Sequence, residues 1–443
     1  MLRLGSTSEK VSGIGGIAVV GKAFERFSLD ERFRAEGQAY RADRISDRDI
    51  CIATMGLQCQ GRTDFSDIEL FRVDPLFMHG LNLKRMMSEE TLRQRLNGLA
   101  RDPRNLLNIR QANVDFLKRV TLGEISTPLS SYIPFDADVS TLDNSKSKKE
   151  GVGRTYMKTD GFAPVFGYVG TQGWLLDLEL RPGVQHSQNG APAFFKGCLQ
   201  KLRELGVLER CLFRLDSGHD AAETIDCLRG HCDFLIKRNP RRESVEHWHS
   251  LAKALGEETV PRPGKTVYTG TVEHLRPGSD EARQPVTVVF RVTVRQTDAK
   301  GEEFLFPQIT FDTWWTSLGE DAKTVIRLYE DHGTSEQFHS ELKTDLNLER
   351  LPSGTFATNH LFLLLGMLAY NSLRLIDQSM LQRRELLPIH KEVNRRRVGS
   401  IIRDVVFVGC KLVARSRDLI IKIWEKNPWY EAIEQTFTSL ATT

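Results

Sequence analysis

The stretch that decides the fold is "SYIPFDADVS", residues 131–140. It reads as a short β-strand, and successive strand residues point to opposite faces of a sheet. Asp136 and Asp138 therefore lie on the same face. Two more strand-like runs follow, "FAPVFGYVG" (162–170) and "WLLDLELRPG" (174–183), separated by turns rich in Gly, Asp and Lys. We expect these three runs to form antiparallel strands.

Helices and strands then alternate along the chain. The order β-β-β-α-β-α-β is typical of an RNase H-like sheet, in which the first and fourth strands are neighbours. Asp216, at the end of the fourth strand, would then approach Asp138. The four segments are "APAFFKGCLQKLRELG" (helix, 191–206), "RCLFRLDSG" (strand, 210–218), "AAETIDCLRGH" (helix, 221–231) and "CDFLIKR" (strand, 232–238).

The rest of the chain divides around this core, and the predicted fold class is α/β. We expect an RNase H-like catalytic core over residues 131–238 and 311–385, interrupted by a β-rich insertion at 239–310. The insertion contains "PVTVVFRVTVRQT", which alternates as a half-buried strand does. An N-terminal helical region (1–130) and a C-terminal basic helical region (386–443) flank the core; the outward Arg93 and Arg95 of the former suit either a DNA-binding helix or an exposed helix of a plain bundle.

The segment "YEDHGTSEQFHSELK", residues 329–343, places many ionisable groups on one expected helix. Each helical residue turns by about 100°, so every third or fourth residue shares a face. Such stripes are most often solvated faces with charge pairing one turn apart. The aligned residues are Tyr329, His332, Glu336 and Lys343. The opposite face carries the apolar side chains expected of a core, Phe338, Leu342 and Leu346.

Three carboxylates meet if these expectations hold together: Asp138, Asp216 and Glu336. They repel one another, and bringing them together is costly unless a cation lies between them. Carboxylate oxygens suit Mg²⁺ or Mn²⁺, and two such ions activate a water or 3′-hydroxyl and stabilise the leaving oxygen in phosphoryl transfer. Each aspartate taken alone is better explained as a turn-forming residue, and only the joint order of strands and helix favours the catalytic interpretation.

Charge and cysteine content narrow the class of protein. The net charge of +3 over 443 residues is too small to establish a polyanion partner. Residues 391–422 carry nine Lys or Arg against three acids, enough either for phosphate binding or for a solvated face.

The seven cysteines form no zinc-binding spacing, and the first residues lack the apolar run of a signal peptide, so we expect free thiols in the cytoplasm and no membrane partner.

These motifs resemble those of the DDE transposases of bacterial insertion sequences, and most of all the thirteen-eighty group. That group's signature, Y-x2-R-x3-E-x6-K, matches the spacing of Tyr329, His332, Glu336 and Lys343, with His332 in place of Arg. The stretches "DADVSTLDNSKSKKEGVGRTY" and "RLDSGHD" also look like that group's, and the resemblance runs from about residue 10 to 425.

The resemblance implies a catalytic and metal-binding triad of Asp138, Asp216 and Glu336 with two Mg²⁺ (or Mn²⁺) ions. Asp136 stays open as the alternative to Asp138, although Asp-x-Ser fits the first motif better. The implied activity is cut-and-paste transposition by a bacterial protein. A homodimer would bind the terminal inverted repeats of double-stranded DNA and release the element through a hairpin before joining it to target DNA.

The resemblance also suggests which residues bind DNA: Tyr329, His332, Lys343, Arg395, Arg396 and Arg397. An Arg at position 332 would give a permanent bidentate phosphate contact, whereas His332 is charged only part of the time near neutrality. Trp248, Trp314 and Trp315 are available for stacking on a flipped base or for core packing. Two other hypotheses stand: a catalytically inactive, transposase-derived DNA-binding protein, and a nuclease without strand transfer.

Overall fold

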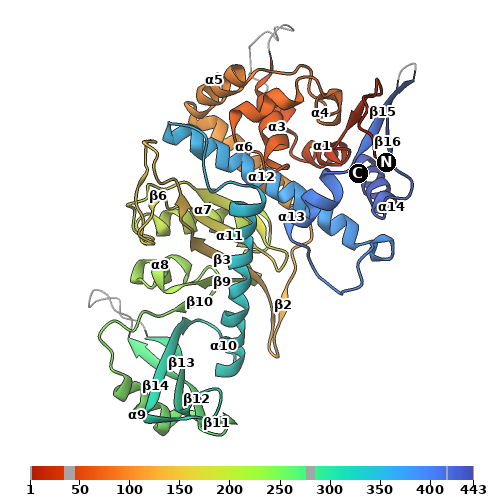
Figure 1. Cartoon of the computed structure of the whole chain (residues 1–443). Helices are drawn as coiled ribbons and strands as arrows, with labels where there is room; N and C mark the ends of the chain where they lie inside the picture. The colour runs from red at the N-terminus through yellow and green to blue at the C-terminus, as the bar shows by residue number, and fades with distance from the viewer. Residues whose placement is uncertain (1, 34–44, 276–284, 416–417, 443) are drawn as a thin grey trace.

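A mixed β-sheet lies at the centre of the molecule, a computed structural model that describes residues 2–33, 45–275, 285–415 and 418–442. The core strands of this sheet follow the spatial order β10-β9-β3-β7-β8, of which Figure 1 labels the first three. Their bounds are β3 Ser131–Val139, β7 Val165–Val169, β8 Trp174–Glu179, β9 Cys211–Leu215 and β10 Asp233–Lys237.

Strand directions in the core match the predicted RNase H-like order. β3, β7 and β8 are antiparallel neighbours, whereas β9 runs parallel to both β3 and β10. Two helices, α7 (Ala191–Glu204) and α8 (Ala222–Leu228), make the crossovers between the parallel strands. β9 is buried along its whole length, as expected for a parallel strand covered on both faces.

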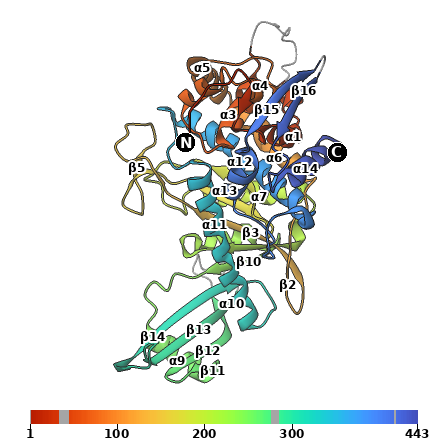
Figure 2. The same ribbon diagram turned by 45° about the vertical axis from the view of Figure 1, so that its right-hand side comes forward.

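The strands of the insertion extend the core sheet and do not form a sheet of their own. It comprises α9 (Val245–Leu255), β11 (Glu257–Arg262), β12 (Lys265–Leu275), β13 (Pro285–Thr297) and β14 (Glu303–Thr316). β14 pairs with β10, so the four insertion strands continue the core sheet into the lower lobe of the molecule (Figures 1 and 2). The predicted boundary at residue 310 therefore falls inside β14.

Three tryptophans hold the insertion to the core. Trp248, Trp314 and Trp315 are each about 1% exposed. Arg238 lies between two of them, its guanidinium carbon 5.6 Å from the Trp248 ring and 4.5 Å from the Trp315 ring. Of the two alternatives for these tryptophans, the structure favours core packing.

Helices from both ends of the chain form the upper lobe. Those of the N-terminal region surround the long helix α12 (Phe356–Leu381), which lies between them and the sheet (Figure 1). None of the helices in the described ranges, α12 included, has the length and apolar character needed to cross a membrane. The N-terminal helices are α1 Ile17–Glu25, α2 Leu29–Arg32, α3 Asp47–Gln58, α4 Pro75–Gly80, α5 Glu89–Ala100 and α6 Pro103–Leu117.

The C-terminal region differs from the helical prediction for 386–443. After α13 (Val398–Ile401) the chain forms a hairpin of β15 (Cys410–Arg415) and β16 (Asp418–Ile423), which pairs with β1 (Val11–Ser12) before α14 (Tyr430–Thr442). The reason is local: "CKLVAR" and "DLIIKI" have the β-branched residues and partial alternation of strands. The two termini consequently lie in the same lobe (Figure 1).

Asn371 joins α12 to the sheet and to α6. Its side-chain amide donates to Asn113 Oδ1 (2.7 Å) and to the Leu175 carbonyl (2.9 Å), and its Oδ1 accepts from the Leu175 amide (2.9 Å). Asn371 and Asn113 are fully buried. Buried polar groups are costly when unpaired, so this network fixes how α12 sits on β8.

We predict that Asn371→Ala lowers the free energy of unfolding by about 2 to 3 kcal/mol, because it leaves the Leu175 amide and Asn113 Oδ1 without their Asn371 partner in the interior. The adjacent Ser372→Ala is the control, since Ser372 only donates to Leu368 within its own helix. It should cost below about 1 kcal/mol. Urea denaturation measures both, and equal losses would contradict the role of Asn371.

Candidate active site

The pairing of β3 with β9 places two aspartates side by side. Residues at equivalent positions include Asp136 with Arg214 and Ala137 with Leu215. One residue further, Asp138 is the penultimate residue of β3 and Asp216 follows the end of β9. Neighbouring strands are about 4.8 Å apart, so the predicted approach of Asp138 and Asp216 follows from this register.

The segment that carries Glu336 is not the single helix that we expected for 329–343. It consists of α10 (Ala322–Glu330), a 3₁₀ turn (Asp331–Gly333), α11 (Thr334–Ser340) and a π-helical turn (Glu341–Asp345). The expected apolar face is confirmed, because its three side chains are at most 2% exposed. The polar stripe, in contrast, is broken at the 3₁₀ turn, which directs His332 into the interior.

Phe338 anchors α11 above the sheet. Its ring covers Gly173, which has a φ of +70° and where a Cβ atom would come within 2.4 Å of the ring. The guanidinium of Arg395 lies on the same ring at 4.5 Å. A glycine at 173 therefore serves both the turn between β7 and β8 and the close approach of α11.

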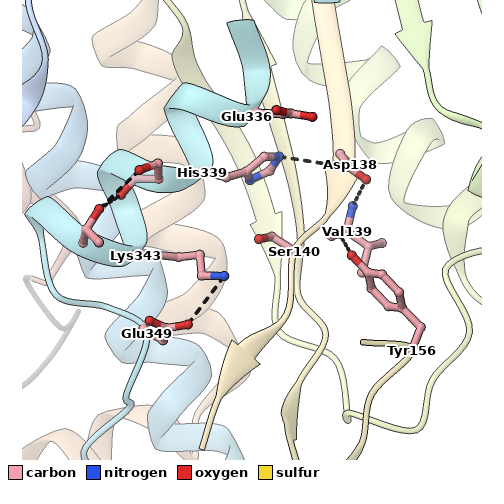
Figure 3. A pocket seen from close by; sticks show the side chains of 10 residues that line it. Asp138, Val139, Ser140, Tyr156, Glu336, His339, Lys343 and Glu349 are labelled. Carbon is pink, nitrogen blue, oxygen red and sulfur yellow. Dashed lines mark hydrogen bonds and ion pairs between the residues drawn. The ribbon is translucent and has the colours of Figure 1, made fainter. Parts of the chain in front are cut away.

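A pocket of about 370 Å³ lies between β3 and α11. Glu336 and His339 project from α11 toward Asp138 on β3, with Lys343 further along the same segment (Figure 3). His339 Nε2 is 3.8 Å from Asp138 Oδ2. Tyr156 also lines the pocket, and its hydroxyl donates to the carbonyl of Val139 at 3.1 Å.

Asp138 carries the strongest sign of carboxylate crowding. Its pKa is raised from the usual 3.8 to about 7, first by burial, then by the charge of Asp216 and, to a smaller degree, by that of Glu336. The charges of Asp216 and Glu336 thus act on Asp138, and the Val139 amide and His332, which lower its pKa, offset burial and these charges only in part.

Asp136 has the opposite environment. Arg214 donates to both of its oxygens at 2.7 Å, and His332 Nδ1 lies 2.9 Å from Oδ1. Burial alone would raise the pKa of Asp136, but the charges and hydrogen bonds of Arg214 and His332 lower it to about 2. Asp136 is therefore engaged in the interior, and Asp138 is the aspartate that faces the pocket.

The residues predicted to contact DNA differ in how exposed they are. His332 is only 7% exposed and forms a hydrogen bond with Asp136. Its predicted contact with a DNA phosphate is therefore corrected to a contact inside the protein. Tyr329 is partly buried, with its ring 5.7 Å from that of Trp314. Lys343 lines the pocket, and its Nζ is 3.5 Å from Glu349 Oε1.

The three adjacent arginines mostly neutralise buried acids. Arg396 is 7% exposed and donates to Asp377 at 2.9 Å, and Arg395 pairs with the buried Glu341. The prediction that Arg396 contacts DNA is therefore corrected, because this side chain is buried and paired with Asp377. Arg397 remains about half exposed and pairs with Asp345 at 2.8 Å.

Two histidines that lie near the acids were not predicted as site residues from the sequence. His339 lies on the Glu336 face of α11, as the spacing Glu-x2-His-x3-Lys would have indicated. His219 follows Asp216 by three residues, and its Nε2 is 3.9 Å from Asp216 Oδ1. Burial lowers the pKa of His219 to about 4 and that of His339 to about 3, so both rings are neutral near pH 7.

Comparison with known proteins assigns the family. The model of the family described as "Transposase DDE domain group 1" matches residues 2–443. The chain belongs to this family. It is therefore a transposase, an enzyme that cleaves DNA and transfers strands.

Two further comparisons add little. The transposase chain is 12% identical to the piggyBac transposase in a cryo-EM structure of its synaptic complex with hairpin DNA. The match has a TM-score of 0.43 and covers 98% of this chain and 80% of that one. A search of curated proteins found no match.

DDE transposases use divalent metal ions, and the donor chemistry of this site fits such an ion. Asp138, Asp216 and Glu336 offer hard oxygen ligands, and the pKa of Asp138 is raised by burial and then by the charge of Asp216, two effects that a bound cation would oppose. As the side chains stand, no group of three His, Cys, Asp or Glu residues within the described ranges is arranged to hold one ion. The fit is thus one of ligand type and charge.

We predict that Asp138→Asn stabilises the metal-free transposase at pH 8. Because the folded-state pKa is raised, the charged form of Asp138 opposes folding, an effect absent below pH 4 that grows until about pH 7. After allowance for partial exposure, the gain in unfolding free energy should be about 1 to 2 kcal/mol. Thermal melts in EDTA at pH 4.5 and 8 measure it, and no gain at pH 8 would contradict the crowding.

Proposed function

We propose that this transposase mobilises a bacterial insertion sequence. It binds the terminal inverted repeats, cleaves the DNA at the element's ends and joins the freed 3′ ends to target DNA. Asp138, Asp216 and Glu336 are the catalytic residues and would hold two Mg²⁺ or Mn²⁺ ions. The observation that supports the proposal is the β3–β9 register, which pairs the ends of the two strands that lead to Asp138 and Asp216, together with the effect of Asp216 and Glu336 on the pKa of Asp138.

The bound ions would supply activation of the attacking water or 3′-hydroxyl and stabilisation of the leaving oxygen. The chain's own side chains orient these ligands. β3 holds Asp138 at the edge of the pocket, and the neutral His339 lies beside its carboxylate, 3.8 Å away, without adding a competing charge. Lys343 places a fixed positive charge on the pocket wall, where it would attract the scissile phosphate.

A second pocket, of about 550 Å³, gives the DNA strand a path toward the acids. Its lining includes Lys146, Lys149 and Arg350, three cations against the single acid Asp143. The two pockets adjoin along the chain, since Glu349 lines the first and Arg350 the second. We infer that phosphates flanking the cleaved bond lie in this cationic pocket.

Other parts of the proposal rest on the family resemblance. Tyr329 and Arg397 keep their proposed DNA contacts because both are at least partly exposed. The helices of residues 1–130 would recognise the ends, two copies of the chain would pair them, and the element would leave through a hairpin.

We predict that Asp216→Asn abolishes cleavage of linear DNA carrying an element end and its flank in Mg²⁺, because a metal ligand is lost, while binding to that DNA in EDTA is nearly unchanged. The matched control is Glu223→Gln, which neutralises an exposed acid on α8 and should cleave normally. A denaturing gel resolves nicked, hairpin and joined products. Cleavage by the Asn variant at the wild-type rate would exclude the assigned role.

The cationic pocket makes a separate prediction. The double variant Lys146→Ala/Arg350→Ala should make the negative slope of log K against log salt shallower by about 2, because each cation neutralises one phosphate. Lys196→Ala/Arg203→Ala, which removes two exposed cations from α7, is the control and should leave the slope unchanged. Fluorescence anisotropy over a salt series gives both slopes. Equal slopes for all three proteins would place the DNA elsewhere.

A further inference from the structure

A buried cluster of Asp136, Arg214 and His332 lies directly behind the catalytic carboxylates. Each member belongs to the same chain segment as one carboxylate. Asp136 precedes Asp138 by two residues on β3, and Arg214 precedes Asp216 by two residues at the end of β9. His332 precedes Glu336 by four residues, in the turn before α11. These three segments come from distant parts of the sequence and meet at this cluster.

The contacts within the cluster are short and shielded from water. Asp136 accepts from Arg214 Nε and Nη2 at 2.7 Å and lies 2.9 Å from His332 Nδ1. Arg214 Nη1 also donates to the carbonyl of Leu328, near the end of α10, at 2.9 Å. The three side chains are 2 to 7% exposed. Polar contacts in such a dry environment are strong and directional, and each partner is left with a large penalty if another is removed.

The carboxylates in front of the cluster push the same segments apart. Asp138 and Asp216 each lie one residue beyond the paired Ala137 and Leu215 of β3 and β9, and Glu336 lines the same pocket as Asp138. Without an opposing attraction, this repulsion would separate β3, β9 and α11 at the pocket when no cation is bound. The cluster supplies that attraction only two to four residues away, and the pairing of Arg214 with Asp136 keeps the guanidinium out of the pocket.

We propose that Asp136, Arg214 and His332 form a positioning clamp that sets the spacing of Asp138, Asp216 and Glu336 for metal binding, and that His332 acts inside the protein and not on DNA. This inference rests on the proposed function, because it concerns the same metal-holding carboxylates. The geometry accounts for His at position 332: its Nδ1 reaches Asp136, whereas a second guanidinium there would crowd Arg214 around one carboxylate.

The test compares His332→Ala with His332→Asn in the full chain. The Asn amide can replace the Nδ1–H donor to Asp136, whereas Ala cannot. Electron paramagnetic resonance of free Mn²⁺ at pH 8 measures metal affinity directly, without DNA or turnover. We expect His332→Ala to weaken Mn²⁺ binding about tenfold or more, as loss of groups that orient metal ligands does. The Asn variant should stay within about threefold of wild type.

The matched control for loss of a buried ionic contact is Asp177→Asn on β8. Asp177 is 5% exposed and pairs with Arg110 at 2.9 Å and Lys201 at 3.0 Å, two strands away from β3 in the same sheet. It should lower the melting temperature while leaving Mn²⁺ affinity unchanged. If His332→Ala does not fold, Arg214→Lys takes its place, since Lys keeps the charge but loses the two-pronged contact with Asp136.

Several outcomes would overturn the clamp. Wild-type Mn²⁺ affinity in His332→Ala would do so, and so would unchanged Mn²⁺ affinity with weaker DNA binding in EDTA, which would make His332 a phosphate contact. Equal losses of Mn²⁺ affinity in the Ala, Asn and Asp177→Asn variants would reduce the cluster to general stability. Asp138→Asn serves as reference: if it binds Mn²⁺ like wild type, the proposed metal site itself fails, independently of the clamp.

Discussion

The parallel pairing of β3 with β9 is the constraint on which the site depends. The register puts Asp136 opposite Arg214 and Ala137 opposite Leu215, so that Asp138 and Asp216 come next at the ends of the two paired strands. The buried pair is neutralised and the pocket-facing pair is not, although the side chains lie on the same face of one sheet. The fold thus places negative charge where a cation can reach it, and burial together with the charge of Asp216 raises the pKa of Asp138 there.

The helical segment from Ala322 to Asp345 is irregular, and its side chains therefore reach three different environments. The 3₁₀ turn directs His332 into the cluster with Asp136, and α11 then presents Glu336 and His339 to the pocket. The π-helical turn finally buries Glu341, whose carboxylate accepts from Arg374 of α12 at 2.5 Å. A regular helix would repeat one face every turn and could not satisfy all three. The irregularities are therefore what connect the pocket to the scaffold.

The scaffold itself is continuous. β14 extends the core sheet into the insertion, while Trp248, Trp315 and Arg238 pack across that junction. On the other side, Asn371 ties α12 to β8 and to the N-terminal helix α6. The pocket thus lies between two lobes that are both bonded to the same sheet, so that DNA held by either lobe would have a defined position relative to the acids.

Sequence alone determined the elements whose signals are local. The order of core strands, the apolar face of α11 and the meeting of Asp138 with Asp216 all follow from periodicity and topology rules. The tertiary structure decided which charged side chains form ion pairs in the interior of the protein. His332 and Arg396 look like exposed cations in the sequence, yet their partners, Asp136 and Asp377, are distant in the chain or on another element. Periodicity carries no information about such partners, because the energy that turns a charged side chain inward comes from an ion pair that exists only after the segments have packed together.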